Sequence, residues 1–218
     1  MTLALFDLDN TLLHGDSDYQ WGQFLVRKGL VDAETHSATN REFYRHYTQG
    51  TLNIHEYAAF TFTFLSEHSM EELQALHREF MAEDVSQMIP AAARALVEQH
   101  RAQGHTLMII TATNSFVTAP IAAAFGIEHL LAVDPKIVNG RYTREIEGVP
   151  TFREGKVTRL QQWLANRTET LAGSYFYSDS HNDLPLLDMV DHPVAVDPDD
   201  TLRATALANG WPVISLRG

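Results

Sequence analysis

The sequence predicts an α/β protein with a Rossmann-like parallel sheet as its core and an inserted helical cap. Three observations indicate this fold class. Short apolar runs alternate with helical patterns over most of the chain, polar residues directly follow three of these runs, and a long block near the N-terminus contains only helical patterns. Alternating strands and helices are typical of βαβ units, whose parallel sheets are covered by helices on both faces.

Five short apolar runs are predicted as strands, at residues 3–6, 106–110, 175–177, 193–198 and 212–216. Helical patterns lie between them at residues 88–104, 116–126 and 155–167. The segment 136–150 is predicted as an antiparallel hairpin beside the sheet, because Asn139-Gly140 favours a two-residue turn. An irregular loop is the alternative for this segment.

The block 16–88 is predicted as a cap of three or four helices, and residues 1–15 with 89–218 as the α/β core. The sequence Ser69 to Glu72 forms a capping box that begins one helix, and Gly50 is suited to end another. A loop of this length without secondary structure is improbable in a compact protein.

Composition narrows the class of protein. The 218 residues include 28 acidic and 16 basic ones, for a net charge of −12, which argues against a nucleic-acid-binding face. No apolar run approaches the ~20 residues of a membrane span, so no membrane partner is expected. The absence of cysteine excludes disulfides and thiolate chemistry. A cytoplasmic location is expected, and the oligomeric state stays open.

Polar residues that carry chemistry follow three of the predicted strands, and one lysine begins a helix. Parallel strands bring their carboxyl ends to one edge of a sheet, where ligands bind. Several carboxylates, a hydroxyl, an amide and one lysine fit a site for Mg²⁺ and a phosphoryl group. The residues are Asp7, Asp9, Thr111, Lys156, Asp179, Asn182 and Asp183.

Four stretches of the chain resemble, in order, the four motifs of the haloacid dehalogenase superfamily of phosphohydrolases. They are "DLDNTL", the threonine after "LMII", the lysine of "EGKVTRL", and "SDSHNDLPLL". The resemblance covers essentially the whole chain. The helical insert is similar to the cap of the subgroup that contains phosphoserine phosphatases and some bacterial histidinol-phosphate phosphatases.

The resemblance implies a Mg²⁺-dependent phosphomonoester hydrolase that works through an aspartyl-phosphate. Asp7 is then the nucleophile and a metal ligand. Asp9 is the general acid and base, and its backbone carbonyl also binds the metal. Asp179 is the main acidic metal ligand of the fourth motif.

The remaining motif residues are implied to hold the phosphoryl group or to support the site. The phosphate-binding residues are Thr111, Ala112, Lys156 and Asn182. Asp183 is implied to act through a metal-bound water or by orienting Lys156, and it also stands where a helix N-cap is expected.

The substrate is a small phosphorylated metabolite, and Asp16, His14 and His181 are the candidate residues to contact it. Asp18 is expected instead to cap the helix that follows it. No Lys or Arg occurs from residue 46 to 77, which disfavours pairing with the carboxylate of phosphoserine. A cationic or aromatic leaving group such as that of histidinol phosphate is favoured.

Three alternatives stay open at this point. The chain could be a phosphoserine phosphatase, or a phosphotransferase of the same superfamily that passes the phosphoryl group to an organic acceptor. The non-enzyme alternative is a binding domain that kept the fold and lost catalysis.

Overall fold

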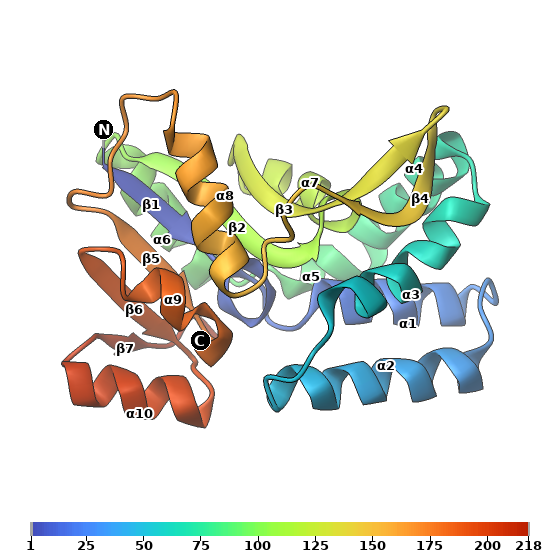
Figure 1. Cartoon of the computed structure of the whole chain (residues 1–218), viewed down its shortest axis with the longest axis horizontal. Helices are drawn as coiled ribbons and strands as arrows, with labels where there is room; N and C mark the ends of the chain where they lie inside the picture. The colour runs from blue at the N-terminus through green and yellow to red at the C-terminus, as the bar shows by residue number, and fades with distance from the viewer. Residues whose placement is uncertain (1, 218) are drawn as a thin grey trace.

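The computed structural model describes residues 2–217. In this range the strands form one seven-stranded sheet in the order β4-β3-β2-β1-β5-β6-β7 (Figure 1). All neighbouring strands are parallel except β3 and β4. The strands are β1 (Leu3–Phe6), β2 (Thr106–Asn114), β3 (His129–Val138), β4 (Arg141–Glu147), β5 (Tyr175–Ser178), β6 (His192–Val196) and β7 (Val213–Ile214).

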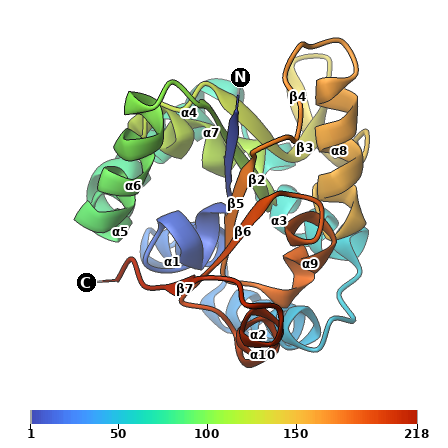
Figure 2. The ribbon, with the colours of Figure 1, turned by 90° about the vertical axis from the view of Figure 1, so that its left-hand side faces the viewer.

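Helices cover both faces of the sheet, as the sequence predicts (Figure 2). Residues of β1 alternate between the two faces because successive side chains of a strand point in opposite directions. Ala4 and Phe6 pack with α1 (Ser17–Arg27), α6 (Ala91–Ala102) and α7 (Ser115–Ala124). Leu3 and Leu5 pack against α8 (Glu154–Leu164), α9 (Leu184–Leu187) and α10 (Asp200–Asn209). The central strand is therefore buried throughout.

The predicted strands are all present, and one further strand segment was not predicted. The hairpin prediction is confirmed, because Asn139 and Gly140 join β3 to β4 with φ angles of 52° and 74°. β3 itself begins earlier than predicted, at His129, and its first half pairs in parallel with β2. Pro135 lies within β3 and interrupts the strand pattern in the sequence, because proline cannot donate to the ladder.

The helices between β1 and α6 form a block beside the sheet (Figure 1). They are α1, α2 (Ala33–Thr48), α3 (Ile54–Glu67), α4 (Met70–Phe80) and α5 (Ser86–Met88), with the π-helical turn Met81–Val85 between the last two. This is more than the three or four helices predicted. The capping box at Ser69 and Glu72 is confirmed, and Gly50 with a φ of +67° follows the end of α2.

Several contacts attach this helical block to the sheet and to the helices that cover it. Trp21 of α1 packs edge-on against Phe116 of α7, with ring centroids 5.4 Å apart. Arg144 of β4 donates to the carbonyl of Ala59 in α3 at 3.0 Å. These two contacts hold α1 against α7 and α3 along the hairpin.

A buried histidine lies on the α6 side of the sheet among aromatic rings. His100 Nε2 lies 2.8 Å from the hydroxyl of Tyr177, and its Nδ1 lies 2.8 Å from Nδ1 of His105. Phe6 and Tyr175 pack edge-on against the His100 ring. Burial, with the neighbouring His105, lowers the pKa of His100 to about 4.

This lowered pKa predicts a loss of stability in mild acid. The unfolded chain binds a proton at His100 near pH 6.5, whereas the folded protein resists protonation until about pH 4. Between about pH 7 and about pH 5, wild type should therefore lose on the order of 1–2 kcal/mol of unfolding free energy through this group. Urea unfolding of His100→Gln, which cannot be protonated, should lack this loss, whereas the site carboxyls, whose raised pKa values act in the opposite direction, contribute to both proteins. An equal change with pH in both proteins contradicts the prediction.

Candidate active site

The ends of three neighbouring strands converge on one cavity of about 700 Å³. Asp7 directly follows β1, Thr111 lies in the last part of β2, and Asp179 directly follows β5. They meet because β1 lies between β2 and β5 in a parallel arrangement. The structure thus brings the first, second and fourth motifs together at the predicted edge of the sheet.

Lys156, the residue of the third motif, reaches this cavity from the first turn of α8. Its ammonium lies 2.7 Å from Asp7 Oδ1 and 2.7 Å from Asp183 Oδ2. Burial by itself lowers the pKa of Lys156, but the charges of Asp183 and Asp7 more than offset this and raise it. The lysine is therefore a fixed cation between two buried carboxylates.

The sequence predicts Asp183 as the N-cap of a helix, but its side chain does not cap α9. Its carboxylate accepts from Lys156 and, at 2.7 Å, from the hydroxyl of Ser178. The ion pair with a buried ammonium is worth more than a neutral hydrogen bond to a backbone N–H, so it takes the carboxylate away from the helix end. The implied role of orienting Lys156 agrees with this geometry.

Asp7 and Asp179 face each other across one hydroxyl. Thr11 Oγ1 lies 3.3 Å from Asp7 Oδ2 and 3.2 Å from Asp179 Oδ1, but it has a single proton to donate. Burial raises the pKa of Asp7 to about 7, even though Lys156 opposes this. Burial and the charge of Asp7 raise the pKa of Asp179 well above its usual value. Two oxygens facing one shared donor form a site that a cation fits.

Asp9 is held by two donors on the other side of the site. The backbone N–H of Ser17, at the start of α1, donates to Oδ1 at 2.6 Å, and the Thr113 hydroxyl donates to Oδ2 at 2.7 Å. Burial, with the charge of Asp16, raises the pKa of Asp9 to about 7. A carboxyl with a pKa near neutrality is suited to give and take a proton.

Thr113 and Thr11 are site residues that the sequence prediction missed. Strand alternation favours one side for residues two positions apart, and Thr111 and Thr113 both line the cavity. That alternation at a strand end was a usable signal for Thr113. Thr11 belongs to the first motif, but its contact with Asp179 depends on the pairing of β1 with β5.

The predicted roles of the two aspartates at the start of α1 are exchanged in part. Asp16, not Asp18, caps α1, because it accepts from the backbone N–H of Tyr19 at 2.9 Å. Asp18 is buried, and it accepts from the hydroxyl of Tyr57 and, at 3.1 Å, from the amide of Asn114. The helix begins at Ser17, two residues earlier than the sequence predicted, which turns Asp18 inward. Asp16 still lines the cavity.

The two candidate histidines lie in different surroundings. His181 lines the cavity, and its Nδ1 lies 2.8 Å from the carboxylate of Asp199. His14 is exposed and is not among the residues that line the cavity. Its backbone N–H donates to Met88 at 2.7 Å, which directs this loop toward α5 and away from the site. The structure therefore does not support His14 as a substrate contact.

The outer wall of the cavity is aromatic and comes mainly from the helical block. The lysine and arginine side chains that line the cavity in the described residues are Lys156 and Arg41. Thr111, Ala112 and Asn182 also line it, as their predicted role requires. The aromatic residues are Tyr19, Phe43, Tyr44, Tyr47, Tyr57 and Phe152.

A family model for haloacid dehalogenase-like hydrolases matches residues 4–188, a range that contains all four motifs. The chain belongs to this family. A histidinol-phosphatase of Neisseria meningitidis is 47% identical to this hydrolase over 219 residues and is covered over 99% of both chains. The phosphoserine phosphatase SerB1 of Mycobacterium tuberculosis is 31% identical, with 98% of this chain and 70% of that protein covered.

A solved structure gives the same picture of the fold. A protein of unknown function from Bordetella pertussis matches with a TM-score of 0.93 and 49% identity, over 99% of this chain and 100% of that one. The predictions of the family, the α/β fold class and a phosphatase are confirmed by these matches. Among residues 2–217 of this hydrolase, no helix is both long and apolar enough to cross a membrane. The cytoplasmic location stays a prediction.

The position of Lys156 predicts a large effect on stability in chelator-treated protein. In Lys156→Met, Asp7 and Asp183 lose the cation between them, so the free energy of unfolding should fall by about 3 kcal/mol near neutral pH. The loss should shrink in mild acid, where a carboxyl can take up a proton instead. Lys136→Met is the matched control, because it breaks the exposed pair with Glu145 and should have little effect. Equal effects of the two substitutions in urea unfolding would contradict this account.

Proposed function

We propose that this hydrolase is a Mg²⁺-dependent phosphomonoesterase that acts on a small phosphorylated metabolite through an aspartyl-phosphate on Asp7. The observation that carries the proposal is the position of Asp7. Its carboxylate lies at the cavity with one oxygen on the Lys156 ammonium and the other beside Thr11 and Asp179. A buried nucleophile that is oriented by a fixed cation is suited to attack at phosphorus.

The donor set fits a magnesium ion. Asp7 and Asp179 supply carboxylate oxygens that share one hydroxyl donor, and the Asp9 backbone carbonyl is the third proposed ligand. Residues 2–217 contain no group of three or more His, Cys, Asp or Glu side chains arranged to hold a metal, but Mg²⁺ in proteins often takes only one or two carboxylates and keeps several waters. When bound, it would supply positive charge against the phosphoryl oxygens.

The protein's own groups account for the two chemical steps. Asp7 attacks phosphorus while protonated Asp9 gives its proton to the leaving oxygen, so the metabolite departs as an alcohol. Asp9, now a carboxylate, then takes a proton from the water that attacks the aspartyl-phosphate, which releases phosphate and restores Asp7. Lys156, with Thr111, Ala112 and Asn182, holds the remaining phosphoryl oxygens.

Residues 16–88 act in this proposal as the cap over a core of residues 1–15 and 89–218. The aromatic wall of the cavity comes largely from α1, α2 and α3, and the reacting groups come from the strand ends. Closure of such a cap excludes bulk water and selects the leaving group. This division of labour supports the domain boundary.

Histidinol phosphate is the substrate that this cavity fits best. Five aromatic side chains of α1–α3 and the carboxylate of Asp16 face a leaving group that carries an amine and an imidazole. The segment from residue 46 to 77, which includes α3, has no Lys or Arg to pair with a substrate carboxylate. The full-length similarity to a histidinol-phosphatase supports the same substrate.

Phosphoserine is the second candidate, and one residue favours it. Arg41 of α2 lies outside the segment that lacks basic residues and lines the cavity. A guanidinium there could pair with the carboxylate of phosphoserine. The choice between the substrates therefore depends on whether Arg41 or the aromatic wall contacts the leaving group.

A phosphate-release assay with Mg²⁺ and no organic acceptor separates these possibilities. We expect kcat/KM for histidinol phosphate to exceed that for phosphoserine by at least about 100-fold, because a missing ion pair and a filled aromatic wall each contribute on the order of 1–3 kcal/mol. Arg41→Gln should leave kcat/KM for histidinol phosphate nearly unchanged.

Asp7→Asn should abolish turnover without unfolding the protein. A preference for phosphoserine that Arg41→Gln removes would establish the second candidate, and phosphate release only with an added acceptor would indicate a phosphotransferase.

Removal of the metal should lower the stability of wild type and leave that of Asp179→Asn nearly unchanged. A buried carboxyl whose pKa is raised by folding destabilises the folded state once the pH rises above the pKa that the carboxyl has in the unfolded chain. Asp179→Asn should therefore unfold at a higher temperature than wild type in chelator near neutral pH. Mg²⁺ should raise the melting temperature of wild type and have little effect on Asp179→Asn. Thermal melts with and without Mg²⁺ measure both. A variant that responds to Mg²⁺ like wild type would exclude Asp179 as a ligand.

A further inference from the structure

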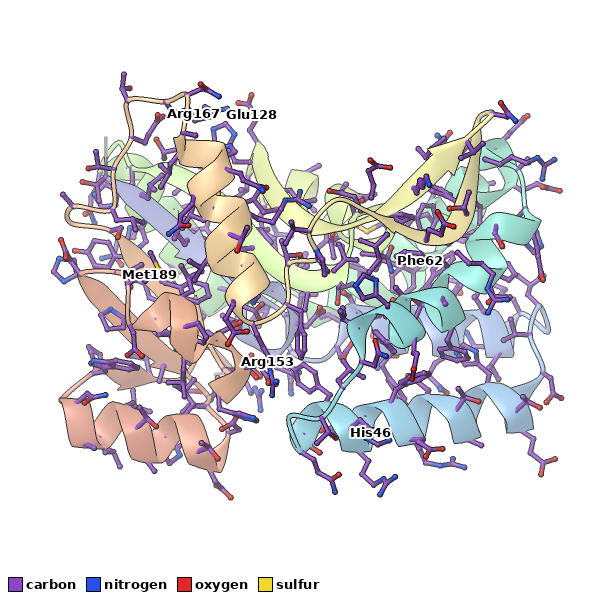
Figure 3. The ribbon with its side chains drawn as sticks, viewed as in Figure 1. His46, Phe62, Glu128, Arg153, Arg167 and Met189 are labelled. Carbon is purple, nitrogen blue, oxygen red and sulfur yellow. The ribbon has the colours of Figure 1, made fainter. Side chains whose placement is uncertain are left out.

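Arg153 has an unusual backbone conformation directly before α8. Its φ of 53° and ψ of −123° lie in a region that residues with a Cβ rarely occupy. Such strain persists only where the surroundings hold it, and it is common at functional sites. Arg153 stands three residues before Lys156. Figure 3 shows it at the N-terminal end of α8, facing the loop that joins α2 to α3.

The guanidinium of Arg153 contacts two segments that are far apart in the sequence. Nε donates to Asn182 Oδ1 at 3.1 Å, and Nη2 donates to the carbonyl of Gly50 after α2. A cation at this position also complements the negative end of the α2 dipole. A Cβ on residue 50 would lie 2.5 Å from Nη2, so the guanidinium would have to shift if residue 50 were not glycine.

The contact with Arg153 determines how the amide of Asn182 is oriented. A guanidinium has only donors, so the atom of Asn182 that faces it is the oxygen. Nδ2 is thereby directed to the other side, where it lies 3.3 Å from Ser180 Oγ and 3.5 Å from the carbonyl of Tyr47. Asn182 and Ser180 both line the cavity, so Nδ2 lies beside the space where a phosphoryl oxygen is proposed to bind, and its two bonds to protein acceptors are long ones.

The end of α2 is connected to the same residues by a further contact. The hydroxyl of Tyr47 donates to Ser180 Oγ at 3.1 Å. The segment from Tyr47 to Gly50 therefore docks on the fourth motif both directly and through Arg153. When this segment moves away, Arg153 loses one of its two acceptors, and the restraint on the Asn182 amide weakens.

We propose that Arg153 is a positioning residue that couples docking of the α2 end to phosphoryl binding by Asn182. The inference rests on the proposed function, in which Asn182 holds the phosphoryl group. Arg153 does not need to touch the substrate. It fixes the donor orientation of Asn182 only while the cap segment is docked, so the site binds phosphate tightly only when the cap is in place.

Binding of inorganic phosphate in the presence of Mg²⁺ tests this coupling by calorimetry. We expect Arg153→Ala to raise the Kd for phosphate by about 10-fold, Asn182→Ala to raise it by a similar factor, and the double variant to be no weaker than the weaker single variant. Arg153→Lys should restore only part of the affinity, because one ammonium cannot bridge both acceptors as the planar guanidinium does. The melting-temperature increase caused by Mg²⁺ should be unchanged in Arg153→Ala, since the proposed metal ligands are intact.

A glycine variant separates the positioning role from a merely structural one. Arg153→Gly relieves the backbone strain, so it should melt no lower than Arg153→Ala and yet lose the same phosphate affinity. Wild-type affinity in Arg153→Ala, or independent losses that multiply in the double variant, would overturn the inference. Failure of wild type itself to bind phosphate with Mg²⁺ would instead overturn the proposed function, and the inference with it.

Discussion

The buried ammonium of Lys156 between Asp7 and Asp183 is the interaction on which the site depends. Without it, the strand ends would bring carboxylates together with no compensating charge, and burial already raises the pKa of Asp7 to about 7. The lysine also fixes one oxygen of Asp7, which leaves the other beside Thr11 and Asp179. The proposed cation completes the charge balance that one ammonium cannot supply. The site is thus built at the expense of stability, as is common where strained or charged groups serve function.

The parallel sheet is the reason that such a site can form from residues so far apart in the chain. Asp7, Thr111 and Asp179 each need only to follow a buried strand, because pairing of β1 with β2 and β5 places the three strand ends together. The helical block then closes the cavity from one side. Its aromatic residues and the Arg153 contact with Gly50 give the cap two roles in the proposal, recognition of the leaving group and support of phosphate binding.

Local sequence patterns predicted the positions of the groups proposed to react better than those of the residues around them. Asp7, Asp9 and Lys156 stand at strand and helix ends that hydrophobic periodicity can locate. The order of the four motifs along the chain supports the same assignment. Asp16 and Asp18 were harder, because a shift of two residues in the start of α1 decides which carboxylate caps the helix and which turns inward to Tyr57. Helix boundaries depend on tertiary packing as well as on capping propensity.

By itself, the sequence determined the fold class, the family resemblance and the residues proposed to carry the chemistry, because these follow from local periodicity and from motifs at element ends. Only the tertiary structure decided which donors hold them. The hydroxyl of Thr113 on Asp9, Thr11 between two carboxylates, and Arg153 between Asn182 and Gly50 all join segments that no local pattern relates. The physical reason is that a hydrogen bond depends on ångström-scale distances, which are set when the sheet, its covering helices and the cap pack together.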